Sequence, residues 1–340
     1  MKSKFAGKTV LVTGGTGSIG SEIVKHLLAA DAAKVIVFSR DEIKHFLMRS
    51  RLRNDSLETI VGDARNITSI EQVFNRFDID IIFHAAAMKH VVMCEEFPME
   101  AVETNISGTQ NVVDMALKYK VPKMITISTD KAASPINILG ATKFIAERIT
   151  LNGNRISRGK QKFACVRFGN VACSRGSVIP VLLDNLLYRK PLQITNVDVT
   201  RFMMEIPDAV KLIIEASDQV LGGEIFILKM KAFKLGDLSD VIVDKIAPKL
   251  GIPKKDIKLE ISGLINGEKL HEELVFESEY NRLFELGDKY IILPDNTSAA
   301  KYPGISKVTV NKYCSNDSEL LTKTEIENII LKYLKANALI

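Results

Sequence analysis

The 340-residue sequence has no tryptophan, few cysteines and no apolar run of the length that crosses a bilayer. Its four cysteines, Cys94, Cys165, Cys173 and Cys314, are far apart and include no C-x-x-C pair. A zinc site or a disulfide framework is therefore not expected. The 46 basic and 41 acidic residues are interspersed, and no stripe of Lys and Arg with aromatic residues is present. This pattern argues against a nucleic-acid-binding protein.

The composition, with 46% hydrophobic and 26% charged residues, indicates a globular chain with a sizeable core. At this length we expect one large α/β unit, or a main domain with an appendage. The first residues, MKSKFAGKTVLVTGG, enter a strand pattern after a few polar positions, which leaves no room for the apolar core of a signal peptide. We therefore expect a cytoplasmic protein without a membrane span.

Short apolar runs alternate with helical patterns through the first half of the chain. The runs lie at 10–12, 35–38, 57–61, 79–84, 124–128 and 163–168, and the helical patterns at 19–30, 42–52, 70–77, 99–119 and 137–151. Short, continuously apolar strands interleaved with helices indicate a parallel sheet that is covered on both faces. The sequence therefore predicts an α/β fold with a doubly wound parallel sheet.

The alternation loosens after about residue 170. The segments 191–194 and 251–267 are rich in turn-forming residues, and an amphipathic helix is predicted at 323–334. We interpret residues 1–172 as a nucleotide-binding domain that includes the catalytic residues, and residues 173–340 as a smaller, mainly substrate-binding portion. Because no linker separates the two parts, we expect them to be interleaved.

A glycine-rich loop directly follows the first predicted strand and opens the first predicted helix. The candidate cofactor contacts in this loop are Thr13, Gly14, Gly17, Ser18, Ile19 and Gly20. Glycine lets the backbone turn tightly and approach a pyrophosphate, whose charge is favoured at a helix N-terminus. In this strand–loop–helix context the spacing predicts a dinucleotide-binding site.

The end of the second predicted strand bears on which dinucleotide is bound. An acidic residue there would hydrogen-bond the ribose hydroxyls of NAD, whereas Ser39 and Arg40 offer a hydroxyl and a guanidinium to the 2′-phosphate of NADP. Asp41 is expected to cap the next helix, in which Lys44 is a further candidate cofactor contact. We therefore predict NADP rather than NAD.

Two further strand ends contribute to the same predicted site. Asp63 and Ala64 follow the third strand, where Asp63 is placed to accept a hydrogen bond from the adenine amine. Ala85 and Ala87 follow the fourth strand, and their small side chains suit close packing of the backbone against a cofactor.

Several motifs together resemble one family of enzymes. They are 87–91 (AMKHV), 128–132 (STDKA), 135–143 (PINILGATK), 167–171 (RFGNV), 174–178 (SRGSV), 200–202 (TRF), 222–226 (GGEIF) and 267–272 (GEKLHE). The chain resembles the extended short-chain dehydrogenase/reductases, and among them the inverting UDP-N-acetylglucosamine 4,6-dehydratases and their capsule-biosynthesis relatives. The resemblance is collinear from about Lys8 to the C-terminal helix, and it implies a Rossmann fold with Val171 among the cofactor contacts.

The resemblance also implies a reaction. Hydride transfer from sugar C4 makes a ketone, a base then removes the C5 proton while an acid protonates the leaving C6 hydroxyl, and hydride returns to C6. Asp130 is the candidate acid and Lys131 the candidate base, with Thr129 beside them. Lys131 must be neutral to act, and we expect desolvation and a nearby nicotinamide cation to lower its pKa.

The family's Tyr-x-x-x-Lys motif is only half present. Lys143 matches the lysine that binds the nicotinamide ribose, but Leu139 occupies the position of the tyrosine. Leucine cannot accept the C4 hydroxyl proton. That proton must pass to another group, for which Asp130, Lys131 and the Thr129 hydroxyl are the candidates.

Substrate contacts implied by the resemblance are Lys89, Asn170, Arg175, Arg201 and Glu268. The two arginines suit a diphosphate by charge and by their forked geometry. Glu268 matches the family's acceptor for the uridine ribose. The implied partners are a UDP-N-acetylhexosamine substrate and further copies of the same chain, as a dimer or a hexamer.

Two other functions are compatible with the same motifs. A UDP-N-acetylglucosamine 4-epimerase would use the same cofactor but would have no need for a C5 base, so the Asp130–Lys131 pair favours dehydration. A protein that binds NADP without chemistry would be consistent with the missing tyrosine. Retention of Asp130, Lys131 and Lys143 argues against it. A dehydratase, with or without C5 inversion, is the function predicted from the sequence.

Overall fold

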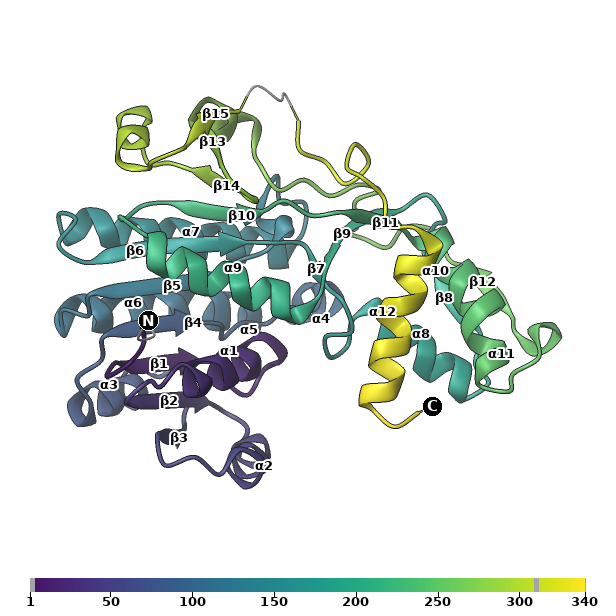
Figure 1. Cartoon of the computed structure of the whole chain (residues 1–340), viewed down its shortest axis with the longest axis horizontal. Coiled ribbons are helices and arrows are strands. Elements are labelled where there is room, and N and C mark those ends of the chain that lie inside the picture. The colour runs from purple at the N-terminus through teal and green to yellow at the C-terminus, as the bar shows by residue number, and fades with distance from the viewer. Residues whose placement is uncertain (1–3, 309–311, 340) are drawn as a thin grey trace.

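A computed structural model describes residues 4–308 and 312–339, and a ten-stranded sheet forms the larger part of the molecule (Figure 1). The strands of this sheet are β1 (Thr9–Thr13), β2 (Lys34–Ser39), β3 (Leu57–Val61), β4 (Ile81–His84), β5 (Lys123–Ile127), β6 (Lys162–Arg167), β10 (Ile225–Leu228), β13 (Leu283–Leu286), β14 (Lys289–Ile292) and β15 (Ser306–Lys307). Their order is β15-β13-β14-β10-β6-β5-β4-β1-β2-β3. The chain order reverses between β4 and β1, and ligands of such sheets bind outside the carboxyl ends of the strands at that point.

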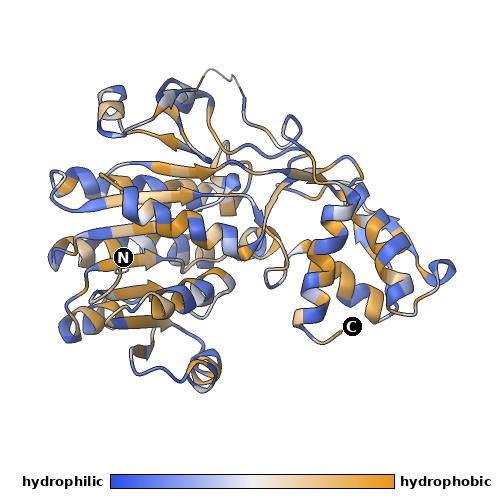
Figure 2. Ribbon diagram, in the orientation of Figure 1, coloured by the Kyte–Doolittle hydropathy of each residue, from blue (hydrophilic) through white to orange (hydrophobic). Residues whose placement is uncertain are grey.

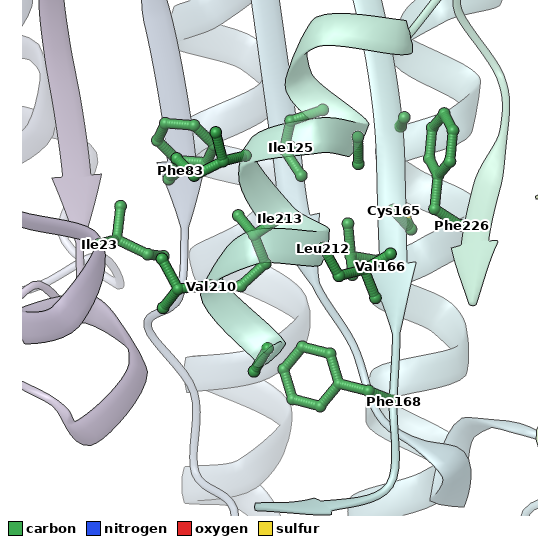
Figure 3. Close-up of a cluster of buried hydrophobic side chains, with 14 of the residues drawn as sticks. Ile23, Phe83, Ile125, Cys165, Val166, Phe168, Val210, Leu212, Ile213 and Phe226 are labelled. Atoms are coloured by element: carbon green, nitrogen blue, oxygen red, sulfur yellow. The ribbon is translucent and has the colours of Figure 1, made fainter. Parts of the chain in front are cut away.

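Helices cover both faces of this sheet. α1 (Ser18–Ala29) and α9 (Ile206–Gln219) lie on one face, and α3 (Ile67–Arg76), α6 (Gly108–Lys118) and α7 (Ile138–Ile156) on the other. The alternation of side chains along β1 divides the core: Val10 and Val12 pack in the cluster that contains Ile23 and Ile213 (Figure 3), whereas Leu11 packs in the other cluster. Burial of each such side chain stabilises the fold by roughly 1.5–3 kcal/mol.

The predicted strands and helices of the first half are present, but the pairing at one edge of the sheet and one helix differ from the prediction. One edge of the sheet is antiparallel, because β14 pairs antiparallel with β10 and with β13, and β13 pairs antiparallel with β15. The single helix predicted at 99–119 is divided into α5 (Pro98–Val102), a π-helical turn at Glu103–Ser107, and α6. Asn105 in that turn is buried and hydrogen-bonds the backbone of Met88, a polar anchor that apolar periodicity does not reveal.

The smaller portion, on the right in Figure 1, has its own apolar cluster. Its elements are β7 (Asn170–Val171), β8 (Leu192–Ile194), β9 (Thr200–Met204), β11 (Ala232–Lys234), β12 (Leu259–Ile261), α8 (Val178–Leu187), α10 (Leu235–Val241), α11 (Ala247–Lys249) and α12 (Lys323–Ala336). The segments interpreted as turn-rich contain β8 and β12, which pair in parallel, so that interpretation was wrong at those residues. The C-terminal amphipathic helix is confirmed as α12, and Figure 2 shows both hydrophilic and hydrophobic residues along its ribbon.

The remaining helices, α2 (Glu42–Leu52) and α4 (Val91–Glu96), lie beside the carboxyl ends of β2 and β4. The main sheet takes strands from both halves of the sequence, because β10, β13, β14 and β15 follow residue 173. The division at residues 172 and 173 stays a prediction. The four cysteines have free thiols, and Cys94, Cys165 and Cys314 are buried.

Candidate active site

The glycine-rich loop joins β1 to α1 by a path that excludes side chains. Gly14 has a φ of +65°, and a Cβ atom added there would lie 2.7 Å from the backbone of Ala85. A Cβ atom at Gly20 would lie 2.3 Å from the carbonyl oxygen of Gly14. Gly17 is the N-cap of α1 and provides no side chain to bond the first amides of the helix. Those amides therefore keep the capacity to bind an anion, and the loop fits a dinucleotide pyrophosphate.

Arg175 and Lys89, predicted as substrate contacts, lie against this loop. The Arg175 guanidinium donates to the carbonyl oxygen of Thr16 at 2.5 Å, and its amide donates to the Ser18 hydroxyl at 3.3 Å. The Lys89 ammonium donates to the Arg175 carbonyl oxygen at 2.7 Å. Burial and the charge of Arg175 lower the pKa of Lys89. The glycine-rich loop is called the phosphate loop below. The two cations beside it make this edge of the site suited to phosphate groups.

The residues predicted to select the cofactor also lie at the loop. The hydroxyls of Ser39 and Thr16 are 2.8 Å apart, and the Arg40 guanidinium lies 4.0 Å from the Asp63 carboxylate. The side chain of Arg40 is 55% exposed. It is thus available to a ligand, whereas Lys44 forms an ion pair with Asp41 at 2.5 Å.

Asp41 caps α2, as predicted, by accepting a hydrogen bond from the Lys44 amide. Asp63 is engaged by Arg65, whose amide and guanidinium donate to its two oxygens at 3.0 and 2.9 Å. Burial opposes the charge on Asp63, but these hydrogen bonds outweigh it and lower the pKa of Asp63. A contact with adenine would have to share this carboxylate with Arg65.

The small residues predicted near the cofactor lie at strand ends. Ala64 follows β3 and is buried, and Ala85 and Ala87 follow β4. Val171 lies in β7 and is 8% exposed. Ile19 is the second residue of α1. These positions are close to the carboxyl edge of the sheet, and Ala85 contacts the loop both at Gly14 and by donating its amide to the Thr13 carbonyl oxygen at 3.0 Å.

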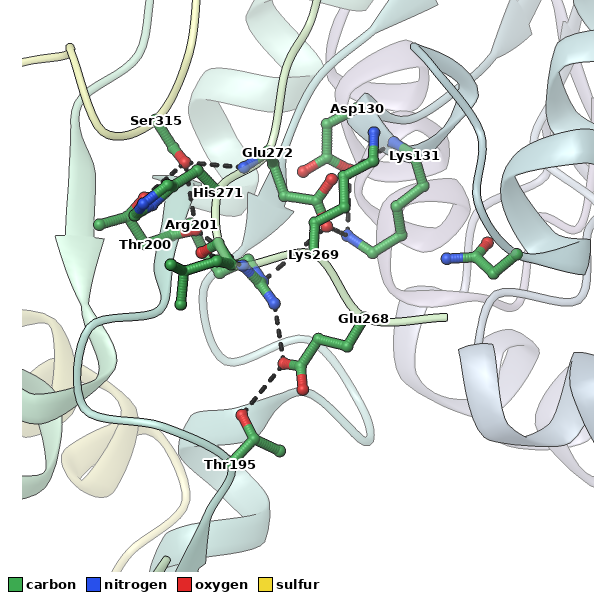
Figure 4. A network of polar contacts seen from close by, with 12 residues as sticks. Asp130, Lys131, Thr195, Thr200, Arg201, Glu268, Lys269, His271, Glu272 and Ser315 are labelled. Atoms are coloured by element: carbon green, nitrogen blue, oxygen red, sulfur yellow. Dashed lines mark hydrogen bonds and ion pairs between the residues drawn. The ribbon is translucent and has the colours of Figure 1, made fainter. Parts of the chain in front are cut away.

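The proposed acid–base residues form a compact group after β5 (Figure 4). The Thr129 hydroxyl donates to Asp130 Oδ1 at 2.7 Å, and the amide and ammonium of Lys131 donate to the same oxygen at 2.8 and 3.1 Å. The Asp130 side chain is fully buried. All three donors thus converge on one oxygen of this carboxylate.

A carboxylate that the sequence analysis did not assign completes this group. Glu272 Oε1 lies 3.4 Å from Lys131 Nζ and 3.9 Å from Arg201 Nε. Arg201 in turn donates to Glu268 Oε1 at 2.8 Å, so these two predicted substrate contacts are paired with each other. The bridge between Thr200 and His271 brings this loop to β9. Glu272 belongs to the GEKLHE motif, which was the available signal.

The charge state of Lys131 differs from the expectation. Burial lowers the pKa of an ammonium, but the charges of Asp130 and Glu272 outweigh it here and raise the pKa of Lys131. Without a ligand, Lys131 is therefore an ammonium ion. Asp130 Oδ2 and Glu272 Oε2 are buried and have no hydrogen-bond partner. Such unsatisfied oxygens are uncommon in folded proteins, and each of these two can accept a hydrogen bond.

Lys143 and Leu139 have separate environments, although they lie one turn apart on α7. Lys143 is buried and donates to the Ile127 carbonyl oxygen at 2.6 Å, and burial lowers its pKa. Leu139 is 4% exposed and packs with Cys94 and Ala101 in a small apolar cluster. The position of the family's tyrosine is thus part of the core. Asn170 opens β7 beside Met203, and its side chain has no assigned contact.

His84, the last residue of β4, connects β1 to α6 through its side chain. Its ring nitrogens lie 2.7 Å from the Thr13 hydroxyl and 3.0 Å from the Thr109 hydroxyl. Burial, with a smaller contribution from Lys143, lowers its pKa to about 3. A neutral, fully bonded imidazole holds Thr13 in place, so Thr13 contributes to the loop through its position.

The fold and sequence were compared with known proteins. A family model described as "Polysaccharide biosynthesis protein" matches residues 10–294. An uncharacterized membrane protein of Methanocaldococcus jannaschii is 43% identical over 328 residues, covering 96% of each protein. A UDP-glucose 4-epimerase of Rickettsia bellii is 38% identical over 337 residues, again covering 96% of each.

Two solved structures show the same architecture. Pen from Bacillus thuringiensis has a TM-score of 0.89 at 40% identity, covering 97% of this chain and 98% of that one. DesIV, a dTDP-glucose 4,6-dehydratase from Streptomyces venezuelae with NAD bound, has a TM-score of 0.71 at 18% identity, covering 97% of each chain.

The fold is therefore that of the extended short-chain dehydrogenase/reductases, whose members among its structural neighbours include nucleotide-sugar epimerases and dehydratases. With a family model matched over most of its length, the chain belongs to the polysaccharide biosynthesis protein family. Within residues 4–308 and 312–339, no helix has both the length and the apolar character needed to cross a membrane.

Proposed function

We propose that this protein is an NADP-dependent UDP-N-acetylglucosamine 4,6-dehydratase, which makes a UDP-4-keto-6-deoxyhexosamine for surface glycans or protein glycosylation. The observation that carries the proposal is the buried group of Asp130, Lys131 and Glu272. Removal of water across C5 and C6 needs a base and an acid at neighbouring atoms, and this group holds both in contact. A simple oxidoreductase has no use for such a pair.

The residues of the phosphate loop would hold the cofactor. The amides at the start of α1 would bind its pyrophosphate, Ser39 and Arg40 its 2′-phosphate, and Lys143 its nicotinamide ribose. The nicotinamide, when bound, supplies reversible oxidation at a sugar carbon. DesIV was determined with NAD, so the preference for NADP rests on Arg40.

Asp130 is proposed to accept the C4 hydroxyl proton, because Leu139 cannot. Its Oδ1 is held by three donors, and its Oδ2 has no partner and can accept a proton. Carrying that proton, Asp130 would then protonate the leaving C6 hydroxyl. Lys131 would remove the C5 proton and later return a proton to C5. Thr129 would orient Asp130 through its hydroxyl.

The nucleotide half of the substrate would bind across both parts of the molecule. Lys89 and Arg175 lie at the phosphate loop, and Arg201 and Glu268 lie at the acid–base group. Arg201 could reach a diphosphate only by giving up its contact with Glu268, which would free the carboxylate for the uridine ribose. Asn170 is the remaining proposed sugar contact. The expected homo-oligomer stays a prediction.

A 4-epimerase is the second candidate. The relative from Rickettsia bellii is named UDP-glucose 4-epimerase and is 38% identical. An epimerase oxidises C4 and reduces it from the opposite face, so it leaves C5 and C6 unchanged. Lys131 would then have no proton to remove.

One incubation separates these functions. Purified protein is incubated with NADP and UDP-N-acetylglucosamine in D2O, and the product is followed by NMR. We expect a 6-deoxy-4-keto sugar with deuterium at C5. A galacto-configured product without deuterium would favour epimerisation, and unchanged substrate would contradict both activities. The same sample with NAD tests the cofactor preference.

A further inference from the structure

Glu272 is held beside Lys131, although no step of the proposed mechanism described above uses it. Its amide donates to the Ser315 hydroxyl at 2.9 Å, and its side chain is 3% exposed. Oε1 lies 3.4 Å from Lys131 Nζ, whereas Oε2 is buried without a partner (Figure 4). A carboxylate in this position raises the pKa of Lys131, the proposed base.

The charged groups around Lys131 come from three segments. Asp130 belongs to the same turn, Glu272 to the loop before β13, and Arg201 to β9. The two carboxylates raise the pKa of Lys131 and outweigh the opposing effects of burial and Arg201. Lys269, on the same loop as Glu272, directs its ammonium to the Ala133 carbonyl oxygen at 2.9 Å. Lys131 therefore carries a proton that it must lose before it can act as a base.

We propose that Glu272 accepts this proton, so that Lys131 and Glu272 work as one base; the inference rests on the proposed dehydratase function. An N–H bond of the Lys131 ammonium breaks and an O–H bond forms on Glu272. The charged pair becomes a neutral amine and a carboxylic acid, and no outside reagent is needed. The amine then removes the C5 proton, and the steps reverse after a proton returns to C5. Glu272 is a positioning residue because it acts through Lys131.

The hydrogen bonds in the group favour Glu272 over Asp130 as this acceptor. Asp130 Oδ1 already accepts three hydrogen bonds, whereas Glu272 Oε1 has only the ion contacts with Lys131 and Arg201. Exclusion of water by a bound sugar further favours neutral partners over charged ones. The transfer requires the 3.4 Å separation to shorten to a hydrogen bond of about 2.7–2.9 Å.

The shared proton makes a specific prediction about pH. In the wild-type protein the charged and neutral pairs hold the same number of protons, so the supply of amine does not change with pH. In Glu272→Gln the amine forms only by loss of a proton to solvent. With UDP-N-acetylglucosamine as the substrate, we expect the uptake of solvent deuterium at C5 to fall on the order of 100-fold at neutral pH. We expect it to recover by about tenfold per pH unit as the pH is raised.

Two variants provide controls. Glu273→Gln changes the next residue, whose carboxylate contacts the Ser134 hydroxyl at 3.4 Å and Lys312 Nζ at 3.2 Å, and should keep the wild-type profile. Glu272→Asp retains a proton acceptor and should keep a flat profile at a lower rate. A Glu272→Gln protein with the wild-type profile, or one that is folded but inactive at every pH, would overturn the proposal.

A titration without substrate separates this inference from the proposed function. The Cε resonance of Lys131 is followed by NMR in ¹³C-lysine-labelled protein and assigned with Lys131→Arg. We expect a lower Lys131 pKa in Glu272→Gln than in the wild type, and equal values would overturn the coupling. If the wild-type protein leaves UDP-N-acetylglucosamine unchanged while the titration shifts, the proposed function fails and the coupling of the two residues stands.

Discussion

Two buried clusters of charge lie at the ends of adjacent strands, and they differ in how completely they are bonded. In the first, Arg167 at the end of β6 donates to Glu147 at 3.0 and 2.7 Å and to Glu279 at 2.8 and 3.2 Å. Glu147 also accepts from the Ser128 hydroxyl at 2.5 Å. In the second, which begins two residues after Ser128, Asp130 and Glu272 each retain an oxygen without a partner.

We call the Arg167 cluster structural, and we call the second cluster, to which the proposed function assigns the chemistry, reactive. An unsatisfied buried polar group costs about 1–3 kcal/mol, so a fold that keeps two of them side by side gives up stability at that place. In the Arg167 cluster the oxygens of Glu147 and Glu279 all accept hydrogen bonds, and the cluster fixes α7 against the segment around Glu279. We infer that the first cluster holds the second in position, and that only the second meets the substrate.

The largest expected effect comes from breaking the reactive cluster at its centre. Lys131→Ala should abolish elimination and C5 deuterium uptake, a loss of about 10³-fold or more, because it removes the proposed C5 base. Cofactor binding should be unchanged. Lys131→Arg is the matched variant: it keeps the positive charge between the carboxylates but cannot give up a proton, and should be equally inactive. Exchange at the wild-type rate in either variant would show that Lys131 is not the base.

Breaking the structural cluster should affect stability instead. Arg167→Met leaves the buried carboxylates of Glu147 and Glu279 without their partner and should lower the free energy of unfolding by about 3–5 kcal/mol. Neutralising both carboxylates in the same protein, with Glu147→Gln and Glu279→Gln, should restore much of this loss. Denaturant unfolding measures both. A single variant with wild-type stability would contradict the structural assignment.

Asp130→Asn should separate the two clusters by chemistry alone. The amide oxygen can still accept from Thr129 and Lys131, so the free energy of unfolding should change little. If Asp130 accepts the C4 hydroxyl proton, the variant should lose about 100-fold in the first oxidation, and no reduced cofactor should accumulate with substrate. Nicotinamide absorbance reports this step. Accumulation of reduced cofactor and a 4-keto sugar would instead limit Asp130 to the later acid role.

The two clusters also show how far the sequence could be interpreted. Asp130 and Lys131 are adjacent in a motif, and the strands before them have the apolar pattern of a parallel sheet, so both were predictable. Glu272 follows no periodic pattern, and contacts between segments far apart in the sequence, such as its hydrogen bond to Ser315 and the bridge between Thr200 and His271, bring it to the site. The antiparallel edge from β13 to β15 was not predicted for a similar reason, because turns and pairing order define it rather than composition.

The Arg40–Asp63 pair lies outside both clusters and should show the smallest effect. Its atoms are 4.0 Å apart and the arginine side chain is 55% exposed, so the pair adds little to stability. Arg40→Ala should therefore leave unfolding unchanged. If Arg40 binds the 2′-phosphate, the variant should weaken NADP binding by about 1.5–3 kcal/mol, the cost of a hydrogen bond to a charged group. NAD lacks that phosphate and should bind as before.

Calorimetric titration with both cofactors tests this, and equal losses would show that Arg40 does not distinguish them. Lys44→Ala, which removes a cation already paired with Asp41, is the control and should weaken NADP binding less.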